Sequence, residues 1–267
     1  MNRAQIAELI ADRLRQENCS EQYQNSASAI GHFVVDDLLP RDLAHDIAAV
    51  FPHKSLKLNS TLRERKEISA QMDQHDKLIE EALFAFQEPA VLEEIARITG
   101  KRDILPDPHL YAGGISAMRK GHFLNPHLDN SHDKDRQNWR VFNLLYYVTP
   151  EWEEKDGGNL ELWPDGVAGK RITVESTFNR LVVMATHDES WHSVSPIEAE
   201  KTRRCISNYY FAPRALRSSE EFHVTSFRGR PEQKFVDLLL RADAKMRGLL
   251  RKAKPAGLFD TEHRYKK

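Results

Sequence analysis

The sequence predicts a mostly β core, a β-sandwich or barrel, with flanking α-helices. From about 104 to 213, short apolar runs alternate with turn residues such as Gly113-Gly114 and Pro164-Asp165-Gly166. Short strands at such close spacing are typical of sandwiches and barrels. The chain before and after this region has helical periodicity instead. We therefore expect one domain over 1–267, with a mainly helical part at 1–100, the β core at 104–213 and a C-terminal helix at 231–252.

Two helices and one strand are expected in the first 51 residues. Within 1–17, apolar residues such as Ile6, Ile10 and Leu14 recur at helical spacing, which predicts an amphipathic helix. The run AIGHFVV (29–35) predicts a short strand, and residues 39–51 predict a second helix.

The next stretch divides into a polar part and a helical part. Residues 54–75 are rich in Lys, Glu, Ser, Gln and Asp without clear periodicity, so we expect a long polar segment there. Residues 76–99 predict a helix that breaks at Pro89 and ends at Gly100, because proline interrupts helices and glycine stops them.

The strands of the core are predicted from four apolar runs: VFNLLYYV (141–148), NLELW (159–163), NRLVVMA (179–185) and RCISNYYF (204–211). Helical spacing returns after Pro231, in FVDLLL and AKMRGLL. The tail from Lys254 is basic, and we expect it to be loose.

Composition and charge argue against several classes of protein. The net charge is −1, and no basic patch indicates a nucleic-acid or anionic-membrane partner. The apolar runs are too short to span a bilayer, and the N-terminal helix lacks the unbroken apolar core of a signal peptide. Cys19 and Cys205 form no motif. We therefore expect no disulfide framework and a cytoplasmic location.

His127 and Asp129, in NPHLDNSHD (125–133), are the first candidates for a chemical site. If they end a strand, residues two apart point to the same face, where an imidazole and a carboxylate can bind one metal. The third candidate ligand is His192, which follows the predicted strand at 179–185. Two histidines and one carboxylate form the facial triad of non-haem Fe(II) oxygenases. The alternative is a polar turn in which Asp129 caps local backbone.

Arg203 begins the last predicted strand of the core. By alternation, Arg203, Cys205 and Ser207 share one face of that strand. An arginine inside a small barrel is costly unless it meets an anion. A dicarboxylate would supply one, through a bidentate contact that lysine cannot reproduce. The alternative is that Arg203 and Arg204 both face water.

Three blocks of the β core carry a family resemblance. They are GHFLNPHLDN (121–130) with its His-x-Asp pair, LLYYVTPEWEEKDGGNLELWPDG (144–166) with its tyrosine strand and Gly-Gly, and HSVSPIEAEKTRRCISNYYF (192–211) with a distal His followed by Thr-Arg. In this order the blocks resemble the Fe(II)/2-oxoglutarate-dependent dioxygenases, most of all their prolyl-4-hydroxylase-type branch. The resemblance implies a double-stranded β-helix, or jelly-roll, of the cupin-like type.

The resemblance also implies roles for the candidate residues. It makes His127, Asp129 and His192 the iron ligands. Arg203 would grip the far carboxylate of 2-oxoglutarate, and the hydroxyl of Tyr147 would bond the same carboxylate. Ser207, inward with Arg203, would add a hydroxyl to this group. The implied cofactors are Fe(II), 2-oxoglutarate as cosubstrate and O2, with ascorbate as an optional reductant.

Two positions refine the resemblance. The family often has a tyrosine before the glycine of the first block, where this chain has Met118, so the pocket there must be built differently. Related halogenases replace the carboxylate ligand with a small residue, so that chloride can bind iron. The presence of Asp129 therefore favours hydroxylation.

Other polar and aromatic residues near the blocks receive simpler interpretations. We expect residues 130–138, with His132 and Asp133, to form a solvated loop beside the pocket. We expect His187 to lie at the surface or behind a ligand, and Gly157-Gly158 to form a hairpin turn. Arg228 and Arg230 are expected in a solvated turn. Three tryptophans are expected to pack in the interior: Trp152, Trp163 and Trp191.

The sequence thus predicts a hydroxylase that acts on an unactivated C–H bond and releases succinate and CO2. A peptidyl proline, a free amino acid or another small metabolite is an open choice of substrate, with 54–75 and 130–138 as the expected specificity elements. Two rival hypotheses are a cupin-like metal-dependent isomerase or hydrolase, which needs no inward Arg203, and a non-catalytic ligand-binding β-barrel. We expect no nucleic-acid or membrane partner, and the oligomeric state is left open.

Overall fold

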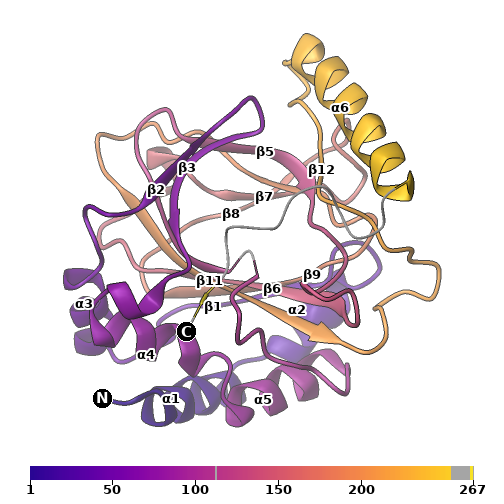
Figure 1. The fold of residues 1–267 in the computed structure, drawn as a ribbon. Coiled ribbons are helices and arrows are strands. Elements are labelled where there is room, and N and C mark those ends of the chain that lie inside the picture. Colours follow the sequence, from indigo (N-terminus) through magenta and orange to yellow (C-terminus); the bar gives the residue numbers. More distant parts are fainter. Residues whose placement is uncertain (112, 254–264, 267) are drawn as a thin grey trace.

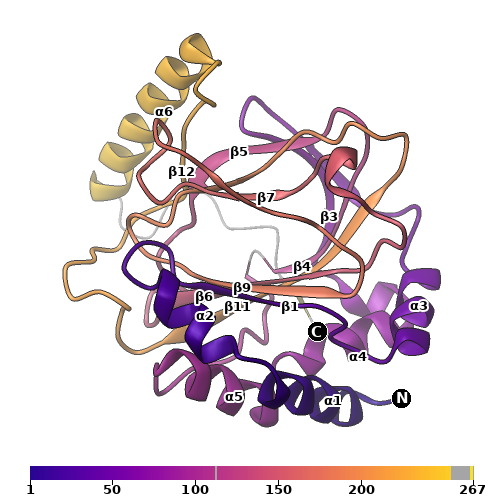
Figure 2. The ribbon, with the colours of Figure 1, turned by 180° about the vertical axis from the view of Figure 1, so that it is seen from behind.

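A single curled antiparallel sheet forms the centre of the molecule, and helices cover one of its faces (Figure 1, and from behind in Figure 2). The computed structural model describes residues 1–111, 113–253 and 265–266. The strand order is β1-β9-β6-β11-β4-β3-β5-β10-β7-β8, with β2 paired to β3 and β12 to β5. This is the architecture of a jelly-roll, so the predicted fold class is confirmed.

The strands are β1 (His32–Val35), β2 (Lys57–Ser60), β3 (Glu64–Ser69), β4 (Gly114–Met118), β5 (Phe123–Leu128), β6 (Trp139–Tyr147), β7 (Leu160–Leu162), β8 (Ile172–Val174), β9 (Arg180–Ala185), β10 (His192–Val194), β11 (Arg203–Ala212) and β12 (Ser226–Phe227). The helices are α1 (Arg3–Gln16), α2 (Cys19–Ser26), α3 (Arg41–Ala49), α4 (Lys77–Ala85), α5 (Pro89–Thr99) and α6 (Lys234–Ala253), with short 3₁₀ turns η1 (Met72–Gln74) and η2 (Glu154–Asp156).

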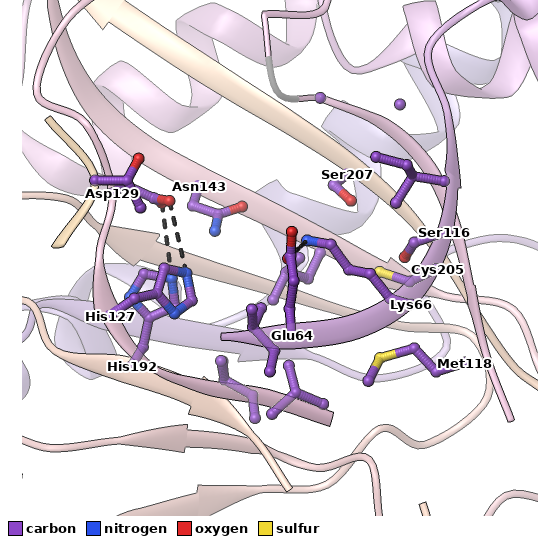
Figure 3. A pocket seen from close by; sticks show the side chains of 18 of the residues that line it. Glu64, Lys66, Ser116, Met118, His127, Asp129, Asn143, His192, Cys205 and Ser207 are labelled. Atoms are coloured by element: carbon purple, nitrogen blue, oxygen red, sulfur yellow. Dashed lines mark ion pairs between the residues drawn. The ribbon is translucent and has the colours of Figure 1, made fainter. Parts of the chain in front are cut away.

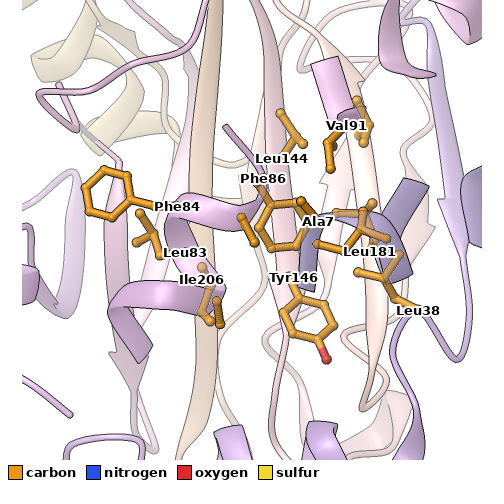
Figure 4. Close-up of a cluster of buried hydrophobic side chains, with 14 of the residues drawn as sticks. Ala7, Leu38, Leu83, Phe84, Phe86, Val91, Leu144, Tyr146, Leu181 and Ile206 are labelled. Atoms are coloured by element: carbon orange, nitrogen blue, oxygen red, sulfur yellow. The ribbon is translucent and has the colours of Figure 1, made fainter. Parts of the chain in front are cut away.

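The hydrophobic core lies between the sheet and the N-terminal helices. Leu144 and Tyr146 of β6 and Ile206 of β11 point into it and meet Leu83 and Phe86 from the helical layer (Figure 4). Successive residues of a strand point to opposite faces, so the residues between these ones are left for the interior of the curl. One face of β6 and β11 is thus committed to packing and the other to a cavity.

Local signals in the sequence set the helix boundaries. Asn2 and Gln5 form a capping box that starts α1. Pro89 takes the first position of α5, separating it from α4, and Gly100 ends α5 with a left-handed φ of 71°. The predicted helices at 1–17 and 76–99 are therefore confirmed, including the break at Pro89. Helix α2 was not predicted.

The interpretation of 54–75 as a polar segment without regular structure is wrong. This segment forms the β2–β3 hairpin, and β3 pairs with both β4 and β5. Glu64, Lys66 and Ile68 of β3 line the interior cavity. A strand whose inner face lines a polar cavity carries no hydrophobic alternation, which is the signal that identifies a half-buried strand in a sequence.

The C-terminal part of the described chain reaches two places. Helix α6 stands at the edge of the sheet beside β12, away from the other helices (Figure 1). Residues 254–264 of the tail predicted to be loose lie outside the described residues, while Tyr265 is buried against Phe84 of the helical layer. No helix within the described residues is long and apolar enough to cross a membrane.

Candidate metal and cosubstrate site

His127 and His192 face each other across two neighbouring strands. They are paired residues in the antiparallel register of β5 and β10, and their ring centroids lie 4.1 Å apart. Asp129 follows two positions after His127, which turns its carboxylate toward the same interior. The Asp129 Oδ1 atom lies 3.7 Å from His127 Nε2, and Oδ2 lies 3.7 Å from His192 Nε2. Sheet pairing thus brings the three predicted ligands together.

Both imidazoles are oriented for metal binding by the backbone. His127 Nδ1 lies 3.0 Å from the carbonyl oxygen of Asn125, and His192 Nδ1 lies 2.9 Å from that of Ser190. Each Nδ1–H donates to its carbonyl, so each Nε2 lone pair is free for a metal. One ligand atom from each of the three side chains fits within 4.8 Å. Two nitrogens and one carboxylate oxygen suit Fe(II).

Burial and mutual charge put the ligands in the right protonation states. Burial, helped by the charge of His192, lowers the pKa of His127 to about 3. Burial alone would raise the pKa of Asp129, but the charges of His192 and Arg140 outweigh it, and the pKa is lowered. At neutral pH His127 is therefore neutral and Asp129 ionised, as metal ligation requires. The buried Oδ2 of Asp129 has no hydrogen-bond partner within the described residues, so a cation would satisfy it.

Arg140 is a residue of this site that sequence reasoning missed. Its buried guanidinium lies 4.0 Å over the ring of Tyr209, with Nη1 3.6 Å from Asp129 Oδ1. A shift of register between Tyr210 and Phe211 turns it inward. Strict alternation along β6 from Asn143 predicts that Val141 points into the cavity, but Val141 packs in the hydrophobic core.

Arg203 lies at another part of the same interior. It is buried, its Nε donates to Ser176 Oγ at 3.0 Å, and its Nη1 lies 3.8 Å from Met118 Sδ. Among the described residues no carboxylate forms an ion pair with it. Gly158 makes room for its side chain, since a Cβ there would lie 2.6 Å from Arg203 Cδ. A buried guanidinium without an anion is costly, so this position fits a carboxylate of a small acid.

Tyr147 and Ser207 differ in their relation to the cavity. Ser207 lines it together with Arg203 and the three ligands. Tyr147 lies behind the lining, with its ring 4.7 Å below the Arg203 guanidinium. Burial raises its pKa to about 12, although the nearby charge of Arg203 opposes the shift. Tyr147 therefore keeps its proton and supports Arg203 from below.

The cavity that joins these residues has a volume of about 680 Å³. Figure 3 shows His127, Asp129 and His192 on one side and Met118, Cys205 and Ser207 on the other. Glu64 and Lys66 of β3 project between the two groups. Sequence reasoning named their segment only as an expected specificity element.

Several minor interpretations need correction. His132 is buried rather than solvated, with Nδ1 2.7 Å from the carbonyl oxygen of Asp133. Arg230 is also buried and pairs with Glu161 at 2.7 Å. Gly157-Gly158 connects η2 to β7, and β7 pairs with β8 and β10, so the two glycines are not a hairpin turn.

Other expectations near the blocks hold. His187 lies behind Asp129, in the lining of a small polar cavity, and burial lowers its pKa to about 4. Trp152 and Trp163 are packed in the interior, where each indole N–H is satisfied.

Comparison with known proteins finds a family match over the β core. Residues 113–211 match the family model of the 2OG-Fe(II) oxygenase superfamily. No curated protein matches the chain significantly. Fe(II) and 2-oxoglutarate are the cofactors of the matched superfamily, and the His-Asp-His set and the buried Arg203 fit them. The resemblance to 2-oxoglutarate/Fe(II) oxygenases is therefore confirmed, and it supports an oxygenase.

Solved structures of several other proteins have a similar fold. A prolyl-4-hydroxylase from Pseudomonas putida is 20% identical with a TM-score of 0.55, covering 74% of this chain and 100% of its own. A prolyl hydroxylase from Trichoplax adhaerens, in complex with a hypoxia-inducible-factor peptide, is 21% identical with a TM-score of 0.52 (78% and 95%). HygX from Streptomyces hygroscopicus, with nickel and 2-oxoglutarate bound, is 12% identical with a TM-score of 0.51 (72% and 86%).

Proposed function

We propose that the chain is an Fe(II)/2-oxoglutarate-dependent dioxygenase that hydroxylates an unactivated C–H bond of a peptide or small-molecule substrate. The observation that carries this proposal is the presence, in one cavity, of the metal-ligand set and of buried Arg203, which has no ion pair among the described residues. Bound Fe(II) and 2-oxoglutarate supply the oxygen chemistry, in which the cosubstrate becomes succinate and CO2. A carboxylate at position 129 favours hydroxylation over halogenation.

Each residue of the site has a defined task in this proposal. His127, Asp129 and His192 would hold the metal through two imidazole nitrogens and one carboxylate oxygen. Arg203 binds the far carboxylate of 2-oxoglutarate, with Ser207 as a second donor and Tyr147 as its support. The curled sheet keeps bulk water from the reacting atoms. In this proposal ascorbate is an optional reductant. The chain forms a single catalytic domain.

Spectroscopy of the anaerobic protein tests the site. Wild type with Fe(II) and 2-oxoglutarate is expected to show a weak visible charge-transfer band, and Arg203→Ala a diminished one at limiting 2-oxoglutarate. Arg204→Ala is the matched control, because this neighbour donates to the Ala48 carbonyl on the other side of the sheet. No band in wild type, or an undiminished band in Arg203→Ala, would contradict the proposal.

Succinate release measures the reaction itself. A screen of peptides, free amino acids and other metabolites, with products identified by mass spectrometry, is expected to show a substrate that gains one oxygen atom. A metal-dependent product formed without 2-oxoglutarate would favour an isomerase or hydrolase instead.

A further inference from the structure

Glu64 and Lys66 form an ion pair inside the cavity. They are alternate residues of β3, so both side chains point to the interior, and Lys66 Nζ lies 3.0 Å from Glu64 Oε2. Their side chains keep 20% and 25% exposure, so both remain accessible from the cavity. Burial would raise the pKa of Glu64, but the charge and hydrogen bond of Lys66 outweigh it and lower the pKa, which keeps the carboxylate charged.

Neither charge uses its full bonding capacity. An ammonium group can donate three hydrogen bonds and a carboxylate can accept several. Within the described residues, the Lys66 ammonium pairs with Glu64, and the Glu64 carboxylate also accepts a hydrogen bond from the Asn59 side-chain amide at 3.4 Å. Each group can therefore bind a ligand while it keeps its partner.

Charge balance favours a ligand that carries both signs. A purely anionic ligand would compete with Glu64 for Lys66, and a purely cationic one would compete with Lys66 for Glu64. Either competition would leave one partly buried charge unpaired, which is costly. A zwitterion places its ammonium on Glu64 and its carboxylate on Lys66, so all four charges stay paired.

The exposed edge of the cavity favours a small molecule over a polypeptide. Arg63, next to Glu64, pairs with Asp243 of α6 at 2.6 Å, and Arg247 pairs with the same carboxylate at 2.9 Å. Arg247 also donates to the Thr225 carbonyl at 3.0 Å. These contacts join the β2–β3 hairpin to α6 beside the cavity, so a long peptide on that side would have to displace them or pass around them.

We propose that Glu64 and Lys66 bind the head group of a small zwitterionic substrate, of which a free α-amino acid is the simplest form. This inference rests on the proposed function and names its substrate class. Glu64 holds the ammonium and Lys66 the carboxylate, and the remainder of the molecule extends toward His127 and the metal. Both residues are positioned by β3 and are distinct from Arg203, which binds the cosubstrate.

Matched substrates test the proposal on the holoenzyme. Succinate release is measured with Fe(II), 2-oxoglutarate and each of the common free α-amino acids, their N-acetyl derivatives and their amides. We expect release with at least one free amino acid and little with its two blocked forms. Anaerobic calorimetry with the same compounds measures binding independently of turnover.

Variants assign the two charges. Glu64→Gln and Lys66→Met are each expected to weaken binding of the active amino acid by about ten- to a hundredfold. Glu64→Gln should not change the affinity for the N-acetyl form, which has no ammonium group. Lys66→Met should not change the affinity for the amide, which has no carboxylate. Glu67→Gln is the matched control, since Glu67 lies on the same strand but pairs with Arg119 on the outside.

The outcomes separate this inference from the proposed function. If wild type shows the charge-transfer band but neither binds nor turns over any free amino acid, the zwitterion inference is overturned and the oxygenase stands. Equal use of free and blocked forms overturns it as well. Loss of the band in Lys66→Met would assign Lys66 to the cosubstrate instead. Absence of the band in wild type removes both proposals.

Discussion

Strands β6 and β11 present two different surfaces on their opposite faces. On the helix side, Phe142, Leu144 and Tyr146 join a large apolar cluster with Ile206. On the inner side, Asn143 and Leu145 of β6 and Arg203 of β11 line a cavity, and the charged side chains of Asp129, Glu64 and Lys66 line it as well. The same backbone therefore supports a stability surface and a chemical surface.

The two faces differ in how many side chains contribute to stability on one side and to ligand binding on the other. Apolar packing is distributed, so each core residue contributes a part of the folding free energy. The polar groups act singly, because a metal needs each ligand and a carboxylate needs its own donor. Substitutions on the helix side should change stability and leave ligand binding intact, and substitutions on the inner side should do the reverse.

The largest effect is expected from removal of a ligand. His127→Ala should weaken Fe(II) binding and turnover by more than about a hundredfold, because loss of a ligand exceeds the ten- to hundredfold effect of outer contacts. Metal titration and succinate release measure it, and circular dichroism should show a folded protein. His45→Ala, at an exposed histidine of α3, is the control. If the His127→Ala variant kept its turnover, the reaction would not take place at the inner face of the sheet.

A cavity on the helix side should be the largest change in stability. Leu144→Ala is expected to lower the free energy of unfolding by about 2–5 kcal/mol, because Leu144 is fully buried in the apolar cluster. Denaturant unfolding measures this loss. Metal affinity of the folded variant should equal that of wild type, and a tenfold drop would mean that the two faces are coupled.

The difference between the faces also explains what the sequence could predict. Strands β6, β9 and β11 were predicted because their core-facing residues are apolar. His127, Asp129, His192 and Arg203 were proposed as site residues from spacing and family blocks, and the fold brings them to one cavity. Strand β3 was missed because its inner residues, Glu64 and Lys66, are polar. A single sequence cannot show that such residues face a cavity rather than water, since both environments accept charges.

Arg140 was missed for a second physical reason. Alternation along β6 fails at the register shift beside Tyr210, and the sequence carries no signal of that bulge. Bulges depend on the pairing of two strands distant in the chain, so they become visible only in three dimensions. The same limit applies to the Gly158 and Arg203 contact, which joins segments on either side of β9.

Arg140→Met should produce a moderate loss of metal affinity. Methionine keeps contact with Tyr209 but removes the charge beside Asp129, so we expect about ten- to a hundredfold weaker binding. Because the Arg140 charge helps to lower the pKa of Asp129, its removal should raise that pKa, and the loss should grow as the pH falls. Arg204→Met is the control on the helix side. A pH-independent loss would mean that Arg140 acts through packing alone.

The smallest effect concerns a carboxyl group that serves no ligand. Asp107 lies near the helical layer, where the Gln87 amide donates to its carbonyl. Burial raises the pKa of its side chain to about 6, although the charge of Arg140 opposes the shift. The folded protein therefore binds this proton more tightly than the unfolded chain, whose carboxyl titrates near pH 4. The contribution of Asp107 to stability is fully present below about pH 4 and is lost as the pH rises through 6.

Asp107→Asn should remove this pH dependence, since the amide stays neutral. Its unfolding free energy should match that of wild type near pH 4.5 to within about 1 kcal/mol and exceed it by on the order of 2 kcal/mol at pH 7.5. Denaturant unfolding at the two pH values measures the difference, and metal affinity should not change. A wild type that equals the variant at pH 7.5 would show that the Asp107 carboxylate has an adequate partner when charged. The charged Asp107 carboxylate would then be stabilised by its surroundings as well as that of Asp129 in the cavity. The two regions would differ in ligand binding alone.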